Sequence, residues 1–249
     1  MRLFLHELRG QLTLYTRSKE LAFFTFLLPL ILFVLLGSTY GNDTINGDRG
    51  ADFLEAGMLG YGLVSTAFAG LAIFMVIRRE SGILKRVRAT PLPAAAYLGA
   101  VLVATLIAFA ANSVFMIAIG RGLFSVPLPK HWLSLVLTLL LGAVAFAALG
   151  LAMTAIVRSA EGASATVNAV YLPMSFISGS FFSPHSFPQF LRVLADVLPL
   201  TYFIRLTRDV MLHNHQLWDN WSDVGAIAAW GAIGTIVAVW RFRWEPAEG

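Results

Sequence analysis

The sequence has no cysteine and little charge. Without cysteine the chain can form no disulfide and no thiolate-bound metal site, which excludes disulfide-stapled domains and zinc fingers. Charged residues make up 13% of the chain, about half of the share that is usual in soluble domains. An ordinary soluble fold is therefore excluded, and a membrane protein is the class that fits this composition.

Motifs that bind nucleotides or catalyse reactions are also missing. A P-loop needs a lysine that follows a glycine, whereas Lys19, Lys85 and Lys130, the only lysines, follow other residues. No HExxH motif occurs, and no carboxylates cluster within an apolar run. We therefore predict that the chain is not an enzyme by itself and holds no cofactor or metal of its own.

Long apolar runs fill most of the chain, which is 57% hydrophobic with a mean hydropathy of +0.73. A helix needs about 20 apolar residues to cross the hydrocarbon layer of a membrane. Six runs reach this length: residues 21–40, 54–77, 94–120, 132–157, 163–182 and 222–240. We predict an all-α polytopic membrane protein with six transmembrane helices in a single domain, residues 1–249.

The distribution of Lys and Arg predicts the orientation of these spans. If the N-terminus is cytoplasmic, the cytoplasmic segments hold 12 Lys and Arg residues and the outer segments hold 6. Cytoplasmic loops carry the excess of positive charge in membrane proteins. The short loop 41–53 fits the outer side, since it has three aspartates and one arginine. Both termini are therefore expected in the cytoplasm.

Residues 1–18 form neither a span nor a cleavable signal peptide. Leu5, Leu8, Leu12 and Tyr15 recur at helical spacing, with charged residues on the other faces. This pattern predicts an amphipathic helix that lies along the inner membrane surface. A frayed leader before the first span is the alternative.

Residues 183–221, between the fifth and sixth spans, are too apolar for a solvated loop and too charged to span. Two short helices around a proline are expected, forming a hairpin that dips into the outer leaflet. Within the second helix, Arg205, Arg208 and Asp209 fall at i, i+3 and i+4 on one narrow face. The candidate residues of this outer hairpin are Pro184, Pro199, Tyr202, Arg205, Arg208 and Asp209. An interfacial helix followed by a loop is the alternative.

The fifth span is the most polar of the six. Asn168, Tyr171, Ser175 and Ser178 follow one face at helical spacing. That face could line a translocation path, or it could form hydrogen bonds between helices, and the pattern does not choose between these roles.

Three other kinds of site receive less support. An intramembrane serine protease is disfavoured, because all five histidines lie outside the expected spans. A carrier coupled to an ion gradient would place ionisable residues within the spans, where the only candidates are Glu55, at the outer end of the second span, and the polar amides Asn112 and Asn168. A loose outer group could bind a cation, but its spacing matches no metal-ligand set: His213, His215, Asp219 and Asp223.

The segment 78–88, RRESGILKRVR, has five basic residues between the second and third runs. On a helix, Ile83, Leu84 and Val87 share one side while the basic residues spread over the rest. A plain connection between two spans would need neither property, so we expect this segment to contact another protein.

The order of these elements resembles the ABC-2 type exporter permeases, the membrane subunits of bacterial ATP-binding-cassette efflux systems. Three passages carry the resemblance. They are the N-terminal helix that leads into the first span, RRESGILKRVRATPLPAAAYLGA (residues 78–100), and ISGSFFSPHSFPQFLRVLADVLPLTYFIRLTRDVM (residues 177–211). Together they extend over nearly the whole chain, and their order is more specific than any one of them.

The resemblance implies a division of labour in the bacterial cytoplasmic, or inner, membrane. Two permease subunits, this chain and a second copy or a similar chain, are expected to meet in the membrane among its lipids. Two ATPase subunits, which bind ATP and magnesium, would dock beneath them, and no nucleic acid is expected. Residues 78–93 form the implied coupling loop that docks on the ATPase. The coupling residues are Arg79, Glu80, Gly82, Ile83, Leu84, Arg86, Val87 and Arg88.

The resemblance also implies a translocation path along the first, second and fifth spans. Its expected residues are Phe23, Ser65, Thr66, Asn168, Tyr171, Ser175 and Ser178. Aromatic and small polar residues suit a hydrophobic or amphiphilic small molecule such as a drug, an antibiotic or a lipid. Export of lipid-linked polysaccharide is the alternative, and a membrane scaffold or sensor that transports nothing is a further one.

Overall fold

The computed structural model describes residues 2–17, 23–90, 92–157 and 159–242, and most of them are helical. The elements in chain order are α1 (Arg2–Arg17), the π-helical turn η1 (Phe23–Leu27), α3 (Leu28–Tyr40), β1 (Thr44–Ile45), β2 (Asp48–Arg49), α4 (Gly50–Leu63), the π-helical turn η2 (Val64–Gly70), α5 (Leu71–Glu80), α6 (Ile83–Arg88), α7 (Ala94–Phe124), α8 (Trp132–Met153), α9 (Ala160–Ile177), the 3₁₀ turn η3 (Pro184–Ser186), α10 (Gln189–Val197), α11 (Pro199–Met211), the 3₁₀ turn η4 (Leu217–Asp219) and α12 (Trp221–Arg241).

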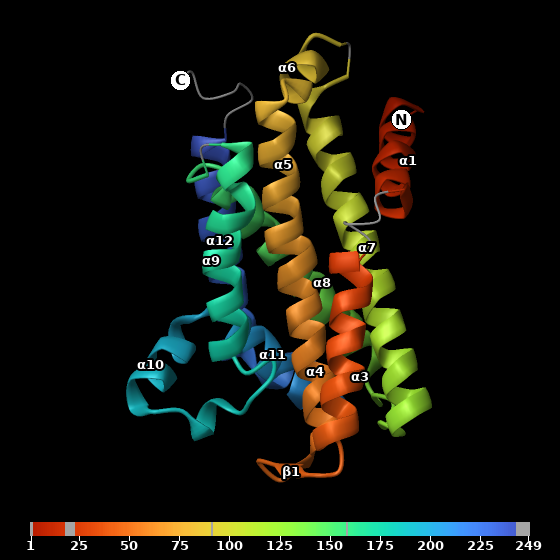
Figure 1. The fold of residues 1–249 in the computed structure, drawn as a ribbon, viewed down its shortest axis with the longest axis vertical. Coiled ribbons are helices and arrows are strands. Elements are labelled where there is room, and N and C mark those ends of the chain that lie inside the picture. Colours follow the sequence, from red (N-terminus) through yellow and green to blue (C-terminus); the bar gives the residue numbers. More distant parts are fainter. Residues whose placement is uncertain (1, 18–22, 91, 158, 243–249) are drawn as a thin grey trace.

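The long helices run between two ends of one bundle, the α6 end and the β-hairpin end that carries β1 and β2 (Figure 1). Four helices among the described residues are long and apolar enough to cross a membrane: Gly50–Glu80, Ala94–Phe124, Trp132–Met153 and Trp221–Arg241. A shorter apolar helix extends over Thr25–Tyr40. At about 1.5 Å per residue, even the 21-residue α12 matches the hydrocarbon thickness of a bilayer. The predicted membrane class is confirmed.

Several helix ends differ from the expected bounds. The expected second span, 54–77, is part of one continuous helix, Gly50–Glu80, which includes η2. The expected fifth span, 163–182, ends at Ile177 because Gly179 has a φ of +93° and reverses the chain. Glycine adopts this left-handed conformation without steric cost.

The connection between α3 and α4 contains a β-hairpin that the sequence analysis treats only as a short loop. Thr44 pairs with Arg49 and Ile45 pairs with Asp48 in antiparallel register. Asn46 and Gly47 form the turn, with φ values of +56° and +93°. An Asn-Gly pair favours this kind of hairpin turn, so the signal was present in the sequence.

The helix Gly50–Glu80 lies at the centre of the bundle, with 72% of its most apolar window buried. It packs against α7, α8, α9 and α11. Small residues allow this close packing: a Cβ at Gly57 would lie 2.2 Å from the backbone oxygen of Ser180. The turn after α9 can therefore approach α4 only because residue 57 has no side chain.

The N-terminal helix α1 packs along the first half of α7 (Figure 1). Gln11 is buried there, and the Tyr15 hydroxyl lies 3.5 Å from the hydroxyl of Thr105 on α7. The predicted helix is present. Its placement along the inner membrane surface stays a prediction.

Candidate functional site

The chain turns sharply between α5 and α6. The Gly82 amide donates to the backbone oxygen of Arg79, and Gly82 has a φ of +72°. Any residue with a Cβ would be strained in this conformation. The glycine of the predicted coupling loop therefore lets α6 start directly after the long central helix.

Helix α6 presents a different face from the one expected. Leu84 is fully buried in the core of the chain, and Val87 is half-buried. Ile83 is 38% exposed, and Lys85, Arg86 and Arg88 are exposed. The prediction that Leu84 faces a partner is therefore wrong, because its side chain already packs within the bundle. The accessible surface of α6 combines one aliphatic side chain with three cations.

Arg79, also expected at a partner interface, is only 4% exposed. Its Nη1 donates to the Thr154 oxygen at 2.8 Å, and its Nη2 donates to the Val157 oxygen at 2.7 Å. Its Nε contacts Oε1 of Glu80 at 2.7 Å. Carbonyls at the C-terminal end of a helix lack intrahelical donors, and Arg79 supplies them at the end of α8. This residue joins α5 to α8 and does not belong to the surface.

Arg78 is also engaged within the chain. It donates to the Tyr97 hydroxyl at 2.6 Å, and its guanidinium carbon lies 4.3 Å from the centroid of the Phe74 ring. A guanidinium over an aromatic face is a favourable cation–π arrangement. Of the five basic residues in segment 78–88, two therefore brace the bundle and three lie on its surface.

Tyr171, on the polar face of the fifth span, contacts Tyr61 of α4. The hydroxyls of Tyr171 and Tyr61 are 3.2 Å apart, and Ser175 Oγ donates to the Tyr171 oxygen at 2.8 Å. Tyr171 and Ser175 are buried, and Asn168 is half-buried. The contact with Tyr61 favours the interhelical role over a path lining for Tyr171, whereas the hydroxyl of Ser175 bonds within α9.

The other expected path residues lie around the two π-helical turns, which contact each other. Phe23 on η1 is 40% exposed, whereas Thr66 on η2 is 1% exposed and its hydroxyl has no hydrogen-bond partner among the described residues. Ser65 is half-buried and lies 3.4 Å from the Gly62 oxygen. π-Helical turns often occur at functional sites, and nothing in the apolar periodicity indicates them.

Two of the three residues considered for ion coupling, Asn112 and Glu55, have different surroundings. Asn112 Nδ2 donates to the Thr25 oxygen at 3.0 Å and so joins α7 to η1. Glu55 is 1% exposed and faces Gly120, where a Cβ would lie 2.2 Å from its Oε2. The amide is thus a structural link, while the carboxyl fits a space left by a glycine.

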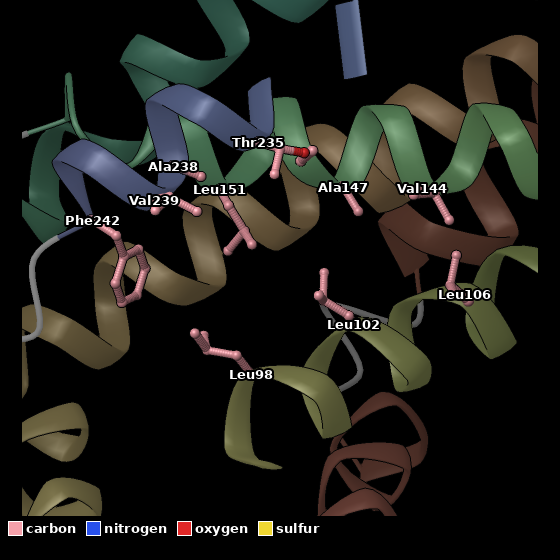
Figure 2. A pocket seen from close by; sticks show the side chains of 11 residues that line it. Leu98, Leu102, Leu106, Val144, Ala147, Leu151, Thr235, Ala238, Val239 and Phe242 are labelled. Carbon is pink, nitrogen blue, oxygen red and sulfur yellow. The ribbon is translucent and has the colours of Figure 1, made fainter. Parts of the chain in front are cut away.

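Figure 2 shows an apolar groove of about 410 Å³ between α7, α8 and α12. Leu98, Leu102 and Leu106 form one side of it, and Phe242 lies near one end. Thr235 is its polar member, and the hydroxyl donates to the Gly231 oxygen within α12. The groove can accept apolar groups but offers no free donor or charge to orient them.

A second cavity, of about 360 Å³, lies at the β-hairpin end beside α10 and α11, and we call it the outer cavity. Its lining residues are Asn46, Asp48, Phe53, Ser178, Pro184, His185, Arg192, Ala195, Asp196, Thr201, Arg205, Arg208, Asp209 and His213. Ser178, assigned to the substrate path from the sequence, is therefore at this cavity, and Pro184 joins it. Most of these side chains are polar, in contrast to the groove.

The hairpin helices α10 and α11 meet at Pro199, as predicted, and the proline occupies the first turn of α11. Arg205, Arg208 and Asp209 share one face of α11 and all line the outer cavity. Arg205 lies 3.5 Å from a carboxylate oxygen of Asp196, whose backbone oxygen accepts from the Tyr202 hydroxyl. Helical spacing thus predicted the set of charges, and folding placed them around a cavity.

His213 links two aspartates at the edge of this cavity. Its Nδ1 is 3.1 Å from Asp209 Oδ1, and its Nε2 is 3.3 Å from Asp48 Oδ1. The hydrogen bond to Asp209, aided by Asp48, raises the pKa of His213 above its usual value.

The four residues that the sequence offered as a loose cation site, His213, His215, Asp219 and Asp223, do not come together around one point. Asp219 accepts from the Gln216 amide and Asp223 lies 3.6 Å from Arg205. Within the described ranges, no three His, Asp or Glu side chains are placed to hold a metal ion.

Comparisons with known proteins agree with this architecture. The family model for the ABC-2 type transporter matches residues 2–212. Nodulation protein J from Rhizobium leguminosarum bv. trifolii is 30% identical over 211 residues, which cover 82% of this chain and 79% of that protein. The inner membrane transport permease YadH from Escherichia coli K12 is 24% identical over 217 residues, covering 85% and 79%. With four membrane-capable helices and a match of this extent, the chain is a membrane protein that belongs to the ABC-2 type transporter family.

Proposed function

We propose that this chain is the permease subunit of an ATP-driven exporter for a hydrophobic or amphiphilic small molecule. Members of the family are transmembrane components and are not catalytic by themselves. The observation that carries the proposal is α6, a short helix with exposed Ile83, Lys85 and Arg86 at the end of the central helix. A chain without a P-loop needs a surface of this kind to receive energy from an ATPase, which would bind ATP and magnesium.

The proposed topology has six crossings with the α6 end in the cytoplasm. The four long apolar helices account for four of them, and η1–α3 and α9 supply the others. Two facts support this orientation: α1 begins and α12 ends at the α6 end (Figure 1), and the basic segment 78–88 lies there. Positive charge concentrates on the cytoplasmic side of membrane proteins.

The contacts of Arg79 suggest how force on α6 would spread. Gly82 joins α6 to α5 through one tight turn, and Arg79 ties α5 to the end of α8. Displacement of α6 by an ATPase would therefore move α5 and α8 together rather than bend a loop. The two π-helical turns η1 and η2 are the places where we expect the first two spans to change register, since π-turns frequently occur at functional sites.

The substrate proposal depends on the small size of the connection between α3 and α4. The connection between α3 and α4 is a small β-hairpin, so among the described residues no separate outer domain precedes α4. A small amphiphile could enter from the membrane along apolar surfaces such as the groove of Figure 2. Lipid-linked polysaccharide remains the second candidate cargo, because exposed aromatic residues such as Phe23 and Phe176 suit a polyprenyl or sugar chain as well.

Charge reversal on α6 tests the coupling proposal. Arg86→Glu with Arg88→Glu should abolish most of the substrate-stimulated ATP hydrolysis of the co-purified complex, because the reversed charges would repel an ATPase surface that is complementary to the present cations of α6. The matched control is Arg49→Glu with Arg121→Glu, which reverses two exposed arginines at the β-hairpin end. Equal turnover in both double variants would contradict the coupling role. Failure of the wild-type chain to co-purify with any ATPase would favour the scaffold or sensor alternative.

A further inference from the structure

The outer cavity contains donors that the chain itself does not use. Ser178 is 1% exposed and Thr201 is 6% exposed, yet neither hydroxyl has a hydrogen-bond partner among the described residues. The Nε of Arg208 is likewise buried and unpaired there. Buried polar groups are nearly always paired, because burial removes their hydrogen bonds to water. Three such groups around one cavity point to a ligand that accepts hydrogen bonds.

Arg208 is held in place by an aromatic ring and a backbone carbonyl. Its guanidinium carbon lies 3.5 Å from the centroid of the Phe53 ring, and Nη2 donates to the Gly179 oxygen. In the described part of the chain, no carboxylate lies within 4.0 Å of Arg208 or Arg192. Arg192 donates from Nε to the Phe187 oxygen at the rim of the cavity. Among the described residues, the two arginines beside the unpaired hydroxyls thus lack a direct carboxylate partner, and Asp48 and Asp209 act on Arg208 from a longer distance.

The aspartates of the cavity have other partners. Asp196 is paired with Arg205, and Asp209 accepts from Asn220 Nδ2 at 2.6 Å in addition to its contact with His213. His213 also contacts Asp48. Each aspartate of the cavity therefore has a partner within the chain, whereas Nε of Arg208 and the hydroxyls of Ser178 and Thr201 have none among the described residues.

We propose that the outer cavity binds a phosphate group. Arg208 and Arg192 would supply the charge, and the hydroxyls of Ser178 and Thr201 would donate to the remaining oxygens. A planar guanidinium next to hydroxyl donors suits a tetrahedral oxyanion with several acceptor oxygens. Free phosphate and a phospholipid headgroup share this chemistry. The inference is independent of the coupling role of α6.

The neighbouring surface suits a phospholipid. Helix α10 leaves Phe190, Val193 and Val197 between 57% and 70% exposed next to the cavity. Acyl chains could lie on this surface while the phosphate occupies the polar cavity, because an apolar helix face beside a polar pocket matches an amphiphile.

Two probes and three variants test this proposal on the full chain in phosphate-free detergent. Calorimetric titration with inorganic phosphate measures the free anion, and native mass spectrometry measures retained phosphatidylglycerol against a neutral glycolipid with the same acyl chains. R208Q should weaken binding of a phosphate-bearing probe at least about tenfold, as expected for loss of a charged hydrogen-bond partner. The double variant S178A/T201V should weaken it about threefold without loss of charge or volume.

R121Q is the matched control, since it removes an exposed arginine at the same end of the bundle, outside the cavity. Binding of phosphatidylglycerol alone would identify a lipid headgroup as the ligand, and binding of inorganic phosphate as well would show that the phosphate group suffices. The proposal is overturned if neither probe binds, or if R121Q loses as much affinity as R208Q. If R208Q does not fold, unchanged binding by S178A/T201V overturns it.

Discussion

Arginine residues gather at both ends of the bundle, and one arginine at each end is held in a different way. At the α6 end, Arg79 donates to two carbonyls at the end of α8 and to the Glu80 carboxylate, so each of its three guanidinium nitrogens has an acceptor. At the β-hairpin end, Arg208 has one carbonyl and one aromatic ring, and its Nε is unpaired.

This difference separates two uses of a buried cation. A guanidinium whose donors are all satisfied by its own chain holds helices together, and its removal leaves acceptors unpaired. A guanidinium with an unpaired buried donor beside a cavity is prepared to bind something else. Charge and position along the sequence do not distinguish Arg79 from Arg208; only the count of acceptors around each one does.

The largest expected effect is on stability at the α6 end. Arg79→Leu should lower the free energy of unfolding by about 3 kcal/mol or more, because the Thr154 and Val157 carbonyls and the Glu80 carboxylate lose their partner. Thermal unfolding followed by size-exclusion chromatography measures this loss. Arg86→Leu, on the exposed face of α6, should change stability by no more than about 0.5 kcal/mol. Similar losses in both variants would remove the distinction between the two kinds of arginine.

A smaller effect is expected from Gly57→Ala, which tests how the outer cavity is built. The new methyl group would press on the Ser180 backbone and so move the turn whose Gly179 oxygen accepts from Arg208. We expect a loss of about 2 kcal/mol in stability together with weaker phosphate binding.

Gly150→Ala is the control, since its methyl group would lie 2.7 Å from the Ala67 oxygen in a different part of the bundle. It should lower stability to a similar extent and leave phosphate binding unchanged. Gly225→Ala, which meets nothing within 4 Å, should be close to neutral in both measurements. Weaker phosphate binding in the Gly150 variant would mean that general loosening, rather than the turn, controls the cavity.

The smallest expected effect concerns pH. The pKa of His213 is raised by its hydrogen bond to Asp209 and by Asp48, so protonation of His213 stabilises the folded chain. This contribution is complete below the usual histidine pKa of about 6.5 and is lost as the pH rises through the higher pKa of the folded state. It should amount to less than about 1 kcal/mol, because the His213 side chain is 45% exposed. Melting temperatures of the wild type and His213→Gln across this range should converge at high pH, and parallel curves would contradict the link.

The sequence predicted the outer hairpin better than it predicted the coupling surface. Arg205, Arg208 and Asp209 share a face simply because helical spacing places i, i+3 and i+4 together, and α11 forms as expected. The same reasoning assigned Leu84 to a partner, although it is buried in the chain. Periodicity identifies an apolar face but not which neighbour covers it.

Two features escaped prediction for different reasons. The turn at Asn46 and Gly47 has a recognisable signal in the sequence, because an Asn-Gly pair favours a hairpin turn. The π-helical turns η1 and η2 had none, because an extra residue in a helical turn leaves no trace in a run that is apolar on all sides.

Composition and local spacing determined the membrane class, the apolar helices, the break at Pro199 and the position of the basic segment. These properties depend on residues close together in the chain, so a sequence contains them directly. Tertiary structure alone decided that Arg79 meets a carbonyl 75 residues away and that Arg208 meets the Phe53 ring. Whether a charge is satisfied depends on acceptors brought from distant segments, and only packing determines which acceptors arrive.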